Sequence, residues 1–132
     1  MGTKAALDLQ IDGRYVESDD PGRLRSALVR IAREEFAEVW LTVDGGPGFA
    51  LLKSGDRALC LFVRSIGDAG FTSRQCKGER KRGSLEFRLT GGKVDHYPES
   101  WTVPFFLALR AADEFLRTGE RPAFLRWHED DS

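Results

Sequence analysis

Residues 39–63 read VWLTVDGGPGFALLKSGDRALCLFV, and this stretch predicts three successive strands. Its apolar runs, at 39–43, 49–52 and 58–63, are rich in branched and aromatic side chains, which favour extended backbone. The glycines, proline and aspartates between the runs predict tight turns. Residues 58–63 are apolar on both faces, as is typical of a central strand covered from both sides. We therefore expect an antiparallel meander at the centre of the fold, with Trp40 in the core.

The segment before the meander predicts a hairpin followed by a helix. Apolar and polar residues alternate over 7–11, which is the period of a half-buried strand, and Asp12-Gly13 predicts a tight turn. Asp20 precedes a proline and is a typical helix-capping residue. Apolar residues then recur at helical spacing, so we expect a helix over Pro21–Glu35.

A second hairpin is predicted after the meander. Apolar and charged residues alternate over 85–89, and Gly91-Gly92 predicts a two-residue turn. This turn would place Arg88 opposite Asp95, an ion pair of the right sign.

The remaining segments complete the expected architecture. Residues 65–83 predict a long loop, residues 102–104 the first turn of a second helix that ends at Gly119, and residues 124–127 a last strand. We therefore predict an α+β protein with a mainly antiparallel sheet of about six to eight strands and two helices packed on it. Its length predicts a single domain over residues 1–132.

The composition argues against several classes of partner. The chain has 20 Lys and Arg against 21 Asp and Glu, a formal net charge of −1, whereas binding to nucleic acid by bulk charge needs a basic excess. No apolar run is long enough to span a bilayer, so no membrane partner is expected, and residues 1–8 reach an acid before a signal peptide could develop. Two cysteines are too few for a disulfide scaffold, which favours a reducing cytoplasm.

The residues that could carry chemistry form no recognisable motif. The candidate metal ligands are Cys60, Cys76, His96 and His128. No two of them have the spacing of a known zinc motif. Ser73, Ser100 or Cys76 could act as a nucleophile, but the spacing favours no nucleophile–base set. An enzyme or small-molecule binder that uses His96 as base would need a deep pocket with an oriented carboxylate. We expect no metal, no cofactor and no catalytic residues.

Residues 74–82 carry five basic side chains and one acidic side chain. The run contains no aromatic residue to stack on bases, although proteins that bind single strands usually combine both features. We interpret it as a solvated loop. The alternative is a small nucleic-acid-binding module that uses this basic loop.

Four motifs follow one another in a defined order. They are LLKSGDRA at 51–58, GDAGFTSR at 67–74, GKVDHYPESWTVP at 92–104 and FLRTGERP at 115–122. In this order and spacing they resemble the Imm1 family of immunity proteins from bacterial polymorphic toxin systems, over about residues 40–128. The basic stretch at 76–82 departs from the polar, non-basic sequence expected there.

The resemblance implies a small α+β protein that is encoded beside a toxin, often one with a deaminase domain, and that protects the producing cell by binding it. Such an inhibitor needs no catalytic set, so the resemblance implies that the protein is not an enzyme. A deaminase toxin that acts on nucleic acid must hold a negatively charged substrate. Carboxylates on the inhibitor could occupy that positive groove and steer the encounter.

We predict that the toxin contacts are carboxylates at the ends of elements, with one aromatic anchor. They are Asp68, Glu99, Trp101, Glu129, Asp130 and Asp131. They would form one acidic face if the last strand lay beside the Asp95 hairpin. In the alternative interpretation, Asp68 caps its own turn, the C-terminal acids are simply solvated, and Trp101 pins a segment. The sequence leaves the oligomeric state open.

Overall fold

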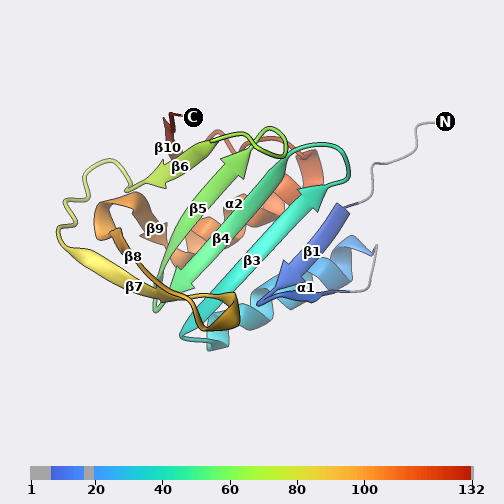
Figure 1. The fold of residues 1–132 in the computed structure, drawn as a ribbon, viewed down its shortest axis with the longest axis horizontal. Coiled ribbons are helices and arrows are strands. Elements are labelled where there is room, and N and C mark those ends of the chain that lie inside the picture. The colour runs from blue at the N-terminus through green and yellow to red at the C-terminus, as the bar shows by residue number, and fades with distance from the viewer. Residues whose placement is uncertain (1–6, 17–19, 132) are drawn as a thin grey trace.

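The computed structural model describes residues 7–16 and 20–131, so residues 1–6, on which the expectation about a signal peptide depends, lie outside the described part. The strands of its large sheet are β1 (Leu7–Ile11), β2 (Arg14–Tyr15), β3 (Phe36–Val43), β4 (Gly48–Ser54), β5 (Arg57–Val63), β6 (Phe71–Arg74), β9 (Thr102–Pro104) and β10 (Arg126–Glu129). Their order is β10-β6-β5-β4-β3-β1-β2, and β9 pairs with β5 (Figure 1). Every pairing is antiparallel, as the sequence predicted.

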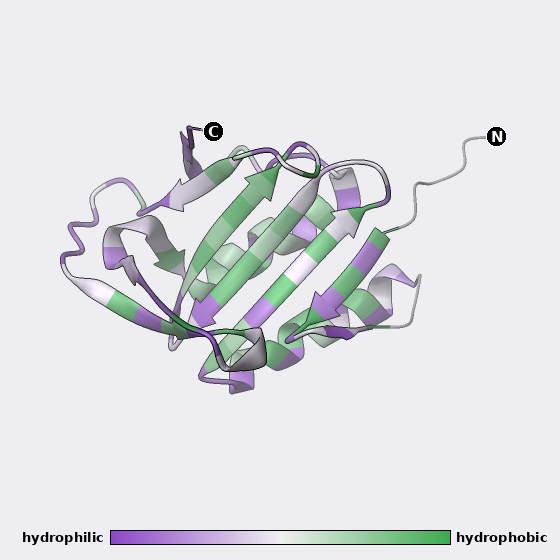
Figure 2. Cartoon of the chain, viewed as in Figure 1, coloured by the Kyte–Doolittle hydropathy of each residue, from purple (hydrophilic) through white to green (hydrophobic). Residues whose placement is uncertain are grey.

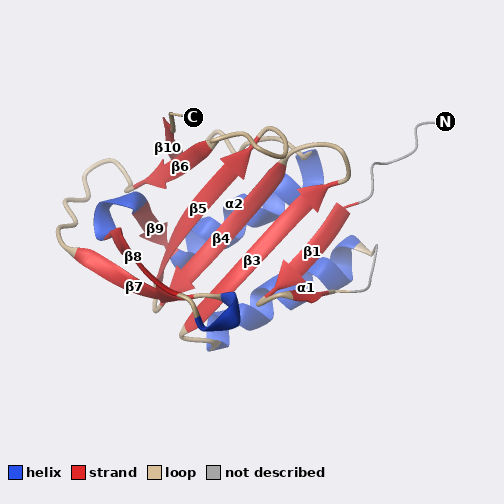
Figure 3. Ribbon diagram, viewed as in Figure 1, coloured by secondary structure: helices blue, strands red, loops and turns tan. Residues whose placement is uncertain are grey.

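Both helices cover one face of this sheet (Figure 3). They are α1 (Pro21–Arg30), which continues into the 3-10 turn η1 (Ile31–Arg33), and α2 (Phe105–Thr118). The Asp20 side chain accepts a hydrogen bond from the Gly22 N–H and caps α1, and Gly119 ends α2 in a left-handed conformation. Both helix signals in the sequence are therefore confirmed. Within the described residues, neither helix combines the length and apolar character that a bilayer crossing requires.

The main core lies between the sheet and the helices. Phe115 on α2 is fully buried and stacks on Phe49 of β4, with ring centroids 5.7 Å apart. Leu24 and Leu28 of α1 close the same cluster beside β1 and β3. Burial of these apolar side chains, at about 25 cal/mol per Å², is what holds the helices on the sheet.

A second, smaller core lies on the opposite face of the sheet. The hairpin of β7 (Ser84–Arg88) and β8 (Val94–Pro98) crosses that face and buries Phe87 against Leu52 and Leu59. β4 and β5 are therefore covered from both sides near this hairpin, which confirms the prediction for residues 58–63. Figure 2 shows these two strands as the apolar centre of the sheet.

The register of this hairpin differs from the prediction by one residue. Arg88 lies opposite Val94, and Phe87 lies opposite Asp95. The Leu89 N–H donates to the carbonyl of Lys93 at 2.8 Å, so the loop contains three residues, not two. The predicted ion pair between Arg88 and Asp95 is wrong, because this extra loop residue shifts the strands past each other: Arg88 pairs with Glu86 and Asp95 with Lys93.

Two strands occupy segments that we expected to be loop or helix. β6 lies inside the predicted loop 65–83, where Phe71 pairs with Phe62 of β5. β9 replaces the predicted first turn of the second helix, which begins only at Phe105. Proline disfavours helical backbone in the residue before it, so Pro104 keeps Val103 extended. The predicted boundaries at Glu35 and at 124–127 also shift, to Arg33 and to Arg126–Glu129.

Candidate partner-binding surface

The residues that could carry chemistry are dispersed or engaged in structural contacts. The Ser73 hydroxyl is buried, where it donates to the Trp101 carbonyl at 2.7 Å and accepts from the Cys60 N–H at 2.9 Å. Burial raises the pKa of the Cys60 thiol. The His96 side chain is 61% exposed and lies 3.9 Å from the Glu86 carboxylate, which is 41% exposed, so this pair lies on the open surface. Within 7–16 and 20–131, no group of three or more His, Cys, Asp or Glu could hold a metal ion.

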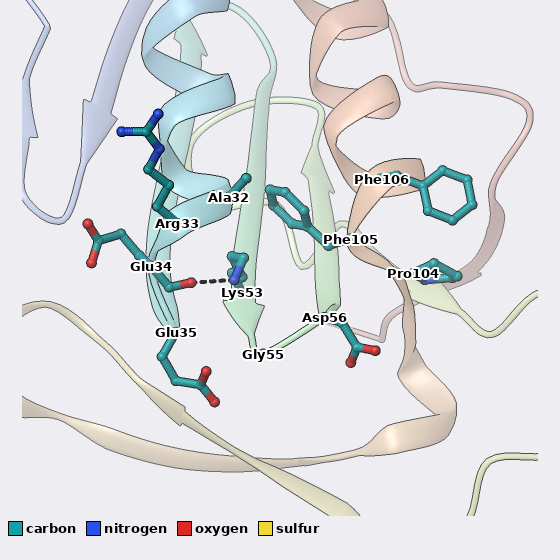
Figure 4. A pocket seen from close by; sticks show the side chains of 10 residues that line it. All are labelled: Ala32, Arg33, Glu34, Glu35, Lys53, Gly55, Asp56, Pro104, Phe105 and Phe106. Carbon is teal, nitrogen blue, oxygen red and sulfur yellow. Dashed lines mark hydrogen bonds between the residues drawn. The ribbon is translucent and has the colours of Figure 1, made fainter.

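A hollow of about 590 Å³ lies between η1, the β4–β5 turn and the start of α2 (Figure 4). The carboxylates of Glu34, Glu35 and Asp56 surround it. The Lys53 ammonium donates to the Glu34 carbonyl and lies 5.1 Å from the centre of the Phe105 ring. Its described lining contains no histidine, cysteine or hydroxyl side chain, and its charged groups are carboxylates and the engaged Lys53 ammonium.

Carboxylates gather where the strands end at one edge of the molecule. Because the sheet is antiparallel, the end of β10, the β5–β6 loop, the β3–β4 turn and the start of β1 all lie along the same edge, the upper one in Figure 1. We call this region the acidic end, and its carboxylates are Asp8, Asp44, Asp68, Glu129, Asp130 and Asp131. Arg64 and Arg121 lie in the same region. Of the carboxylates, only Asp8 and Asp44 were missed by the sequence analysis.

Arg64 joins two of the predicted residues across the acidic end. Its guanidinium lies 3.2 Å from the Asp68 carboxylate and 2.6 Å from the Glu129 carboxylate. Asp68 also accepts a hydrogen bond from the backbone N–H of Arg64 at 2.8 Å, which lowers its pKa and confirms that it caps its own turn. Arg64 therefore holds on one surface two carboxylates that are 61 positions apart in the sequence.

The C-terminal acids are fixed to the sheet. The Thr72 hydroxyl donates to the Asp130 carboxylate, and the Asp130 N–H donates to the Gly70 carbonyl at 2.8 Å. The interpretation of the C-terminal acids as simply solvated is therefore wrong for Glu129 and Asp130. Asp131 remains exposed.

Glu99 and Trp101 lie beside the other end of the short strand β6, next to Lys81 and Arg74. β10 pairs with β6 and not with the Asp95 hairpin, so the condition for a single acidic face is not met. Glu99 is 4.0 Å from Lys81, and the Trp101 ring packs against Arg74 and Tyr97, 4.6 and 6.1 Å away. The six predicted residues thus separate into a group of four and a group of two.

The basic run 74–82 is anchored to the body of the protein. Glu79 forms two hydrogen bonds with the buried Arg57, at 2.9 and 3.3 Å, and accepts a third from the Cys76 N–H. These bonds lower the pKa of Glu79, the contact with Arg57 having the largest effect. The fold places Trp101 next to this loop, but the Trp101 ring already packs against Arg74 and Tyr97.

Trp40 lies on the face of the sheet opposite the helices, half-buried, and not in the core as predicted. Its neighbours Val39 and Leu41 are fully buried under the helices, so strand alternation turns Trp40 to the other side. Its indole N–H donates to the Glu38 carboxylate at 2.9 Å. An aromatic side chain is thus held in place on an open surface.

The chain was compared with models of protein families. The model of the family described as immunity protein Imm1 matches residues 7–129. A search of curated proteins finds no match for this chain.

Proposed function

The chain belongs to the Imm1 family of immunity proteins, and from this we propose that it binds a cognate bacterial toxin and neutralises it by covering the toxin's active or substrate-binding site. The observation that carries this proposal is the family match, which spans nearly every residue that the structure describes. The mechanism is occlusion: an inhibitor of this kind forms and breaks no covalent bond.

The toxin class that best fits the surface is one that acts on nucleic acid, such as a deaminase. Such an enzyme must attract a polyanion, so its substrate groove is positive. The acidic end carries six carboxylates against the two arginines Arg64 and Arg121, and this excess of negative charge fits such a groove. Opposite charge on the two surfaces also accelerates the encounter, to rates well above those of neutral partners.

The contacts are Asp68, Glu129, Asp130 and Asp131, with Asp8 and Asp44 beside them. Arg64 and Thr72 hold three of these carboxylates before the toxin arrives, which lowers the entropy cost of binding. Preorganisation of this kind favours a tight complex.

The test is co-expression of the chain with the toxin domain encoded by the neighbouring gene. We expect the wild type to protect cells, and Glu129→Lys, Asp130→Lys and Asp131→Lys together to lose protection. The matched control is Glu34→Lys, Glu35→Lys and Asp56→Lys, which changes the charge equally at the hollow of Figure 4. Unchanged protection by the first variant would remove the acidic end from the interface, and failure of the wild type would reject the function.

A separate charge swap, Glu99→Lys, tests the remaining part of the six-residue prediction. Glu99 and Trp101 lie away from the acidic end, next to Lys81 and Arg74. If the acidic end alone binds the toxin, Glu99→Lys protects as well as the wild type does. Loss of protection would extend the interface from the acidic end to Glu99 and Trp101.

A further inference from the structure

A continuous row of side chains crosses the open face of the sheet. Its members lie directly opposite one another in the register of seven strands: Tyr15, Gln10, Trp40, Ala50, Leu61, Thr72 and His128. The β7–β8 hairpin covers the neighbouring row, which includes Leu52 and Leu59, and leaves the Trp40 end of this row open. Figure 1 looks onto this face, with the hairpin in front of the sheet and the helices behind it.

At the open end of the row the surface is hollowed by about 360 Å³. The lining side chains are Asp8, Gln10, Tyr15, Trp40 and Thr42. Two of them are aromatic, one is a carboxylate, and the other two offer an amide and a hydroxyl. Among the residues that the structure describes, no positively charged side chain lines the hollow.

The aromatic walls are held differently. Trp40 is fixed by its hydrogen bond to Glu38, which also accepts from the Thr90 N–H at 2.8 Å. Burial acts to raise the pKa of Glu38, but these hydrogen bonds outweigh burial, and the pKa is lowered. The ionised Glu38 carboxylate therefore accepts the hydrogen bond from the indole of Trp40. Tyr15 is 64% exposed, so its ring is open to a partner.

Asp8 supplies the charge of the hollow. Its carboxylate is exposed, and it makes no ion pair or side-chain hydrogen bond within the part of the chain that the structure describes. It also lines an adjoining hollow of about 340 Å³ with Asp44 and Ile66, which is 97% exposed. The aromatic hollow is therefore continuous with the acidic end.

We propose that this hollow receives an arginine side chain of the toxin, whose guanidinium stacks on Trp40 and Tyr15 and pairs with Asp8. The inference rests on the proposed function and names the chemistry of the partner at one position. A guanidinium is planar, stacks on aromatic faces and donates several hydrogen bonds in its own plane, which suits Gln10 and Thr42 as further acceptors. Asp8 belongs both to this hollow and to the acidic end, so a toxin that binds the acidic end also contacts the hollow.

The experiment is calorimetric titration of the purified chain with the purified toxin domain encoded by the neighbouring gene. Asp8→Asn and Tyr15→Ala each weaken binding about tenfold, and Tyr15→Phe, which keeps the ring, binds within about twofold of the wild type. The matched controls are Asp56→Asn and Phe106→Ala, an exposed carboxylate and an exposed aromatic ring on the far side of the molecule, which leave affinity unchanged. Asp8 and Tyr15 lie in paired strands, Asp56 lies in the β4–β5 turn, and Phe106 lies at the start of α2. Circular dichroism of each variant verifies the fold.

Three results would separate this inference from the proposed function. If the wild type binds the toxin and both Asp8→Asn and Tyr15→Ala bind equally well, the hollow receives no arginine and the function stands. Loss of affinity in Asp8→Asn alone, with Tyr15→Ala unchanged, would also overturn the inference, because charge at the acidic end would then suffice. If the wild type itself does not bind, the proposed function fails.

Discussion

Replacement of Glu79 by glutamine tests how the basic loop is anchored. Arg57 on β5 is only 7% exposed, and Glu79 supplies its counter-charge through two hydrogen bonds. The guanidinium keeps two other acceptors in the variant, the Thr102 hydroxyl at 3.0 Å and the Thr102 carbonyl at 2.7 Å. Glu79→Gln therefore removes the negative charge while it preserves part of the hydrogen bonding.

The expected loss follows from this geometry. Removal of one partner from a fully buried ion pair costs about 3–5 kcal/mol. The side chain of Glu79 is 24% exposed, and the remaining bonds to Thr102 compensate in part, so we expect about 2–3 kcal/mol. With an unfolding entropy of about 2.1 cal/mol/K per residue, this lowers the Tm of a chain of this length by about 7–11 °C.

Differential scanning calorimetry measures this change. The matched control is Glu99→Gln, which disturbs only the 4.0 Å contact with Lys81, a surface pair worth about 0.5 kcal/mol or less, and so lowers Tm by under about 2 °C. If Glu79→Gln lowered Tm no more than Glu99→Gln does, the pair with Arg57 would not anchor the loop and the reasoning would be refuted.

Three further predictions concern stability and reactivity. The folded state lowers the pKa of Glu79 below the ordinary 4.5, so the stability that the ionised Glu79 contributes is complete above that pH and is lost as the pH falls through the folded pKa. In urea denaturation, the difference in unfolding free energy between the wild type and Glu79→Gln should therefore shrink in acid. A difference that stays constant with pH would contradict this. Gly70 has φ +76°, and a Cβ there would lie 2.3 Å from the Phe62 carbonyl oxygen. Gly70→Ala should therefore lower the free energy of unfolding by about 2–3 kcal/mol in the same assay. Gly67 has φ +87° but open space around it, so Gly67→Ala should lower this free energy by less. The buried Cys60 thiol, whose pKa is raised, should react with a thiol reagent only after unfolding, and prompt labelling of Cys60 in the native protein would show that β5 opens.

Local chemistry made several elements predictable from sequence. Asp20 before a proline caps α1, Gly119 ends α2, and Asp12-Gly13 turns β1 into β2 with both residues at positive φ. Each of these signals depends on a few neighbouring residues. The meander at 39–63 was predictable for the same reason, because its apolar runs and turn residues alternate within a short stretch.

The missed features depend on contacts between distant segments. β6 and β9 are short and pair with β5, so their own residues show little strand periodicity. Trp40 follows one buried residue and precedes another, and sequence alternation alone does not say which face the helices cover. The register of the β7–β8 hairpin depends on whether its loop has two or three residues, and the Gly91-Gly92 pair permits both lengths.

The candidate site was predictable in part. Arg64 holds Asp68 and Glu129 on one surface, and no sequence pattern connects Arg64 to the C-terminus. Asp8 and Asp44 were missed because each is a single acid at a strand end, and only the antiparallel order of β1, β3 and β4 places them beside the others. The same topology separates Glu99 and Trp101 from that group.

The most direct test of the account is a titration of purified toxin domain with the purified chain, in which residual toxin activity is measured against the molar ratio. Inhibition by occlusion predicts that activity falls in proportion to the chain added, reaches zero at a fixed ratio, and leaves both polypeptides at unchanged mass. If excess chain left the toxin active, or if one chain silenced many toxin molecules, inhibition by stoichiometric binding would be contradicted.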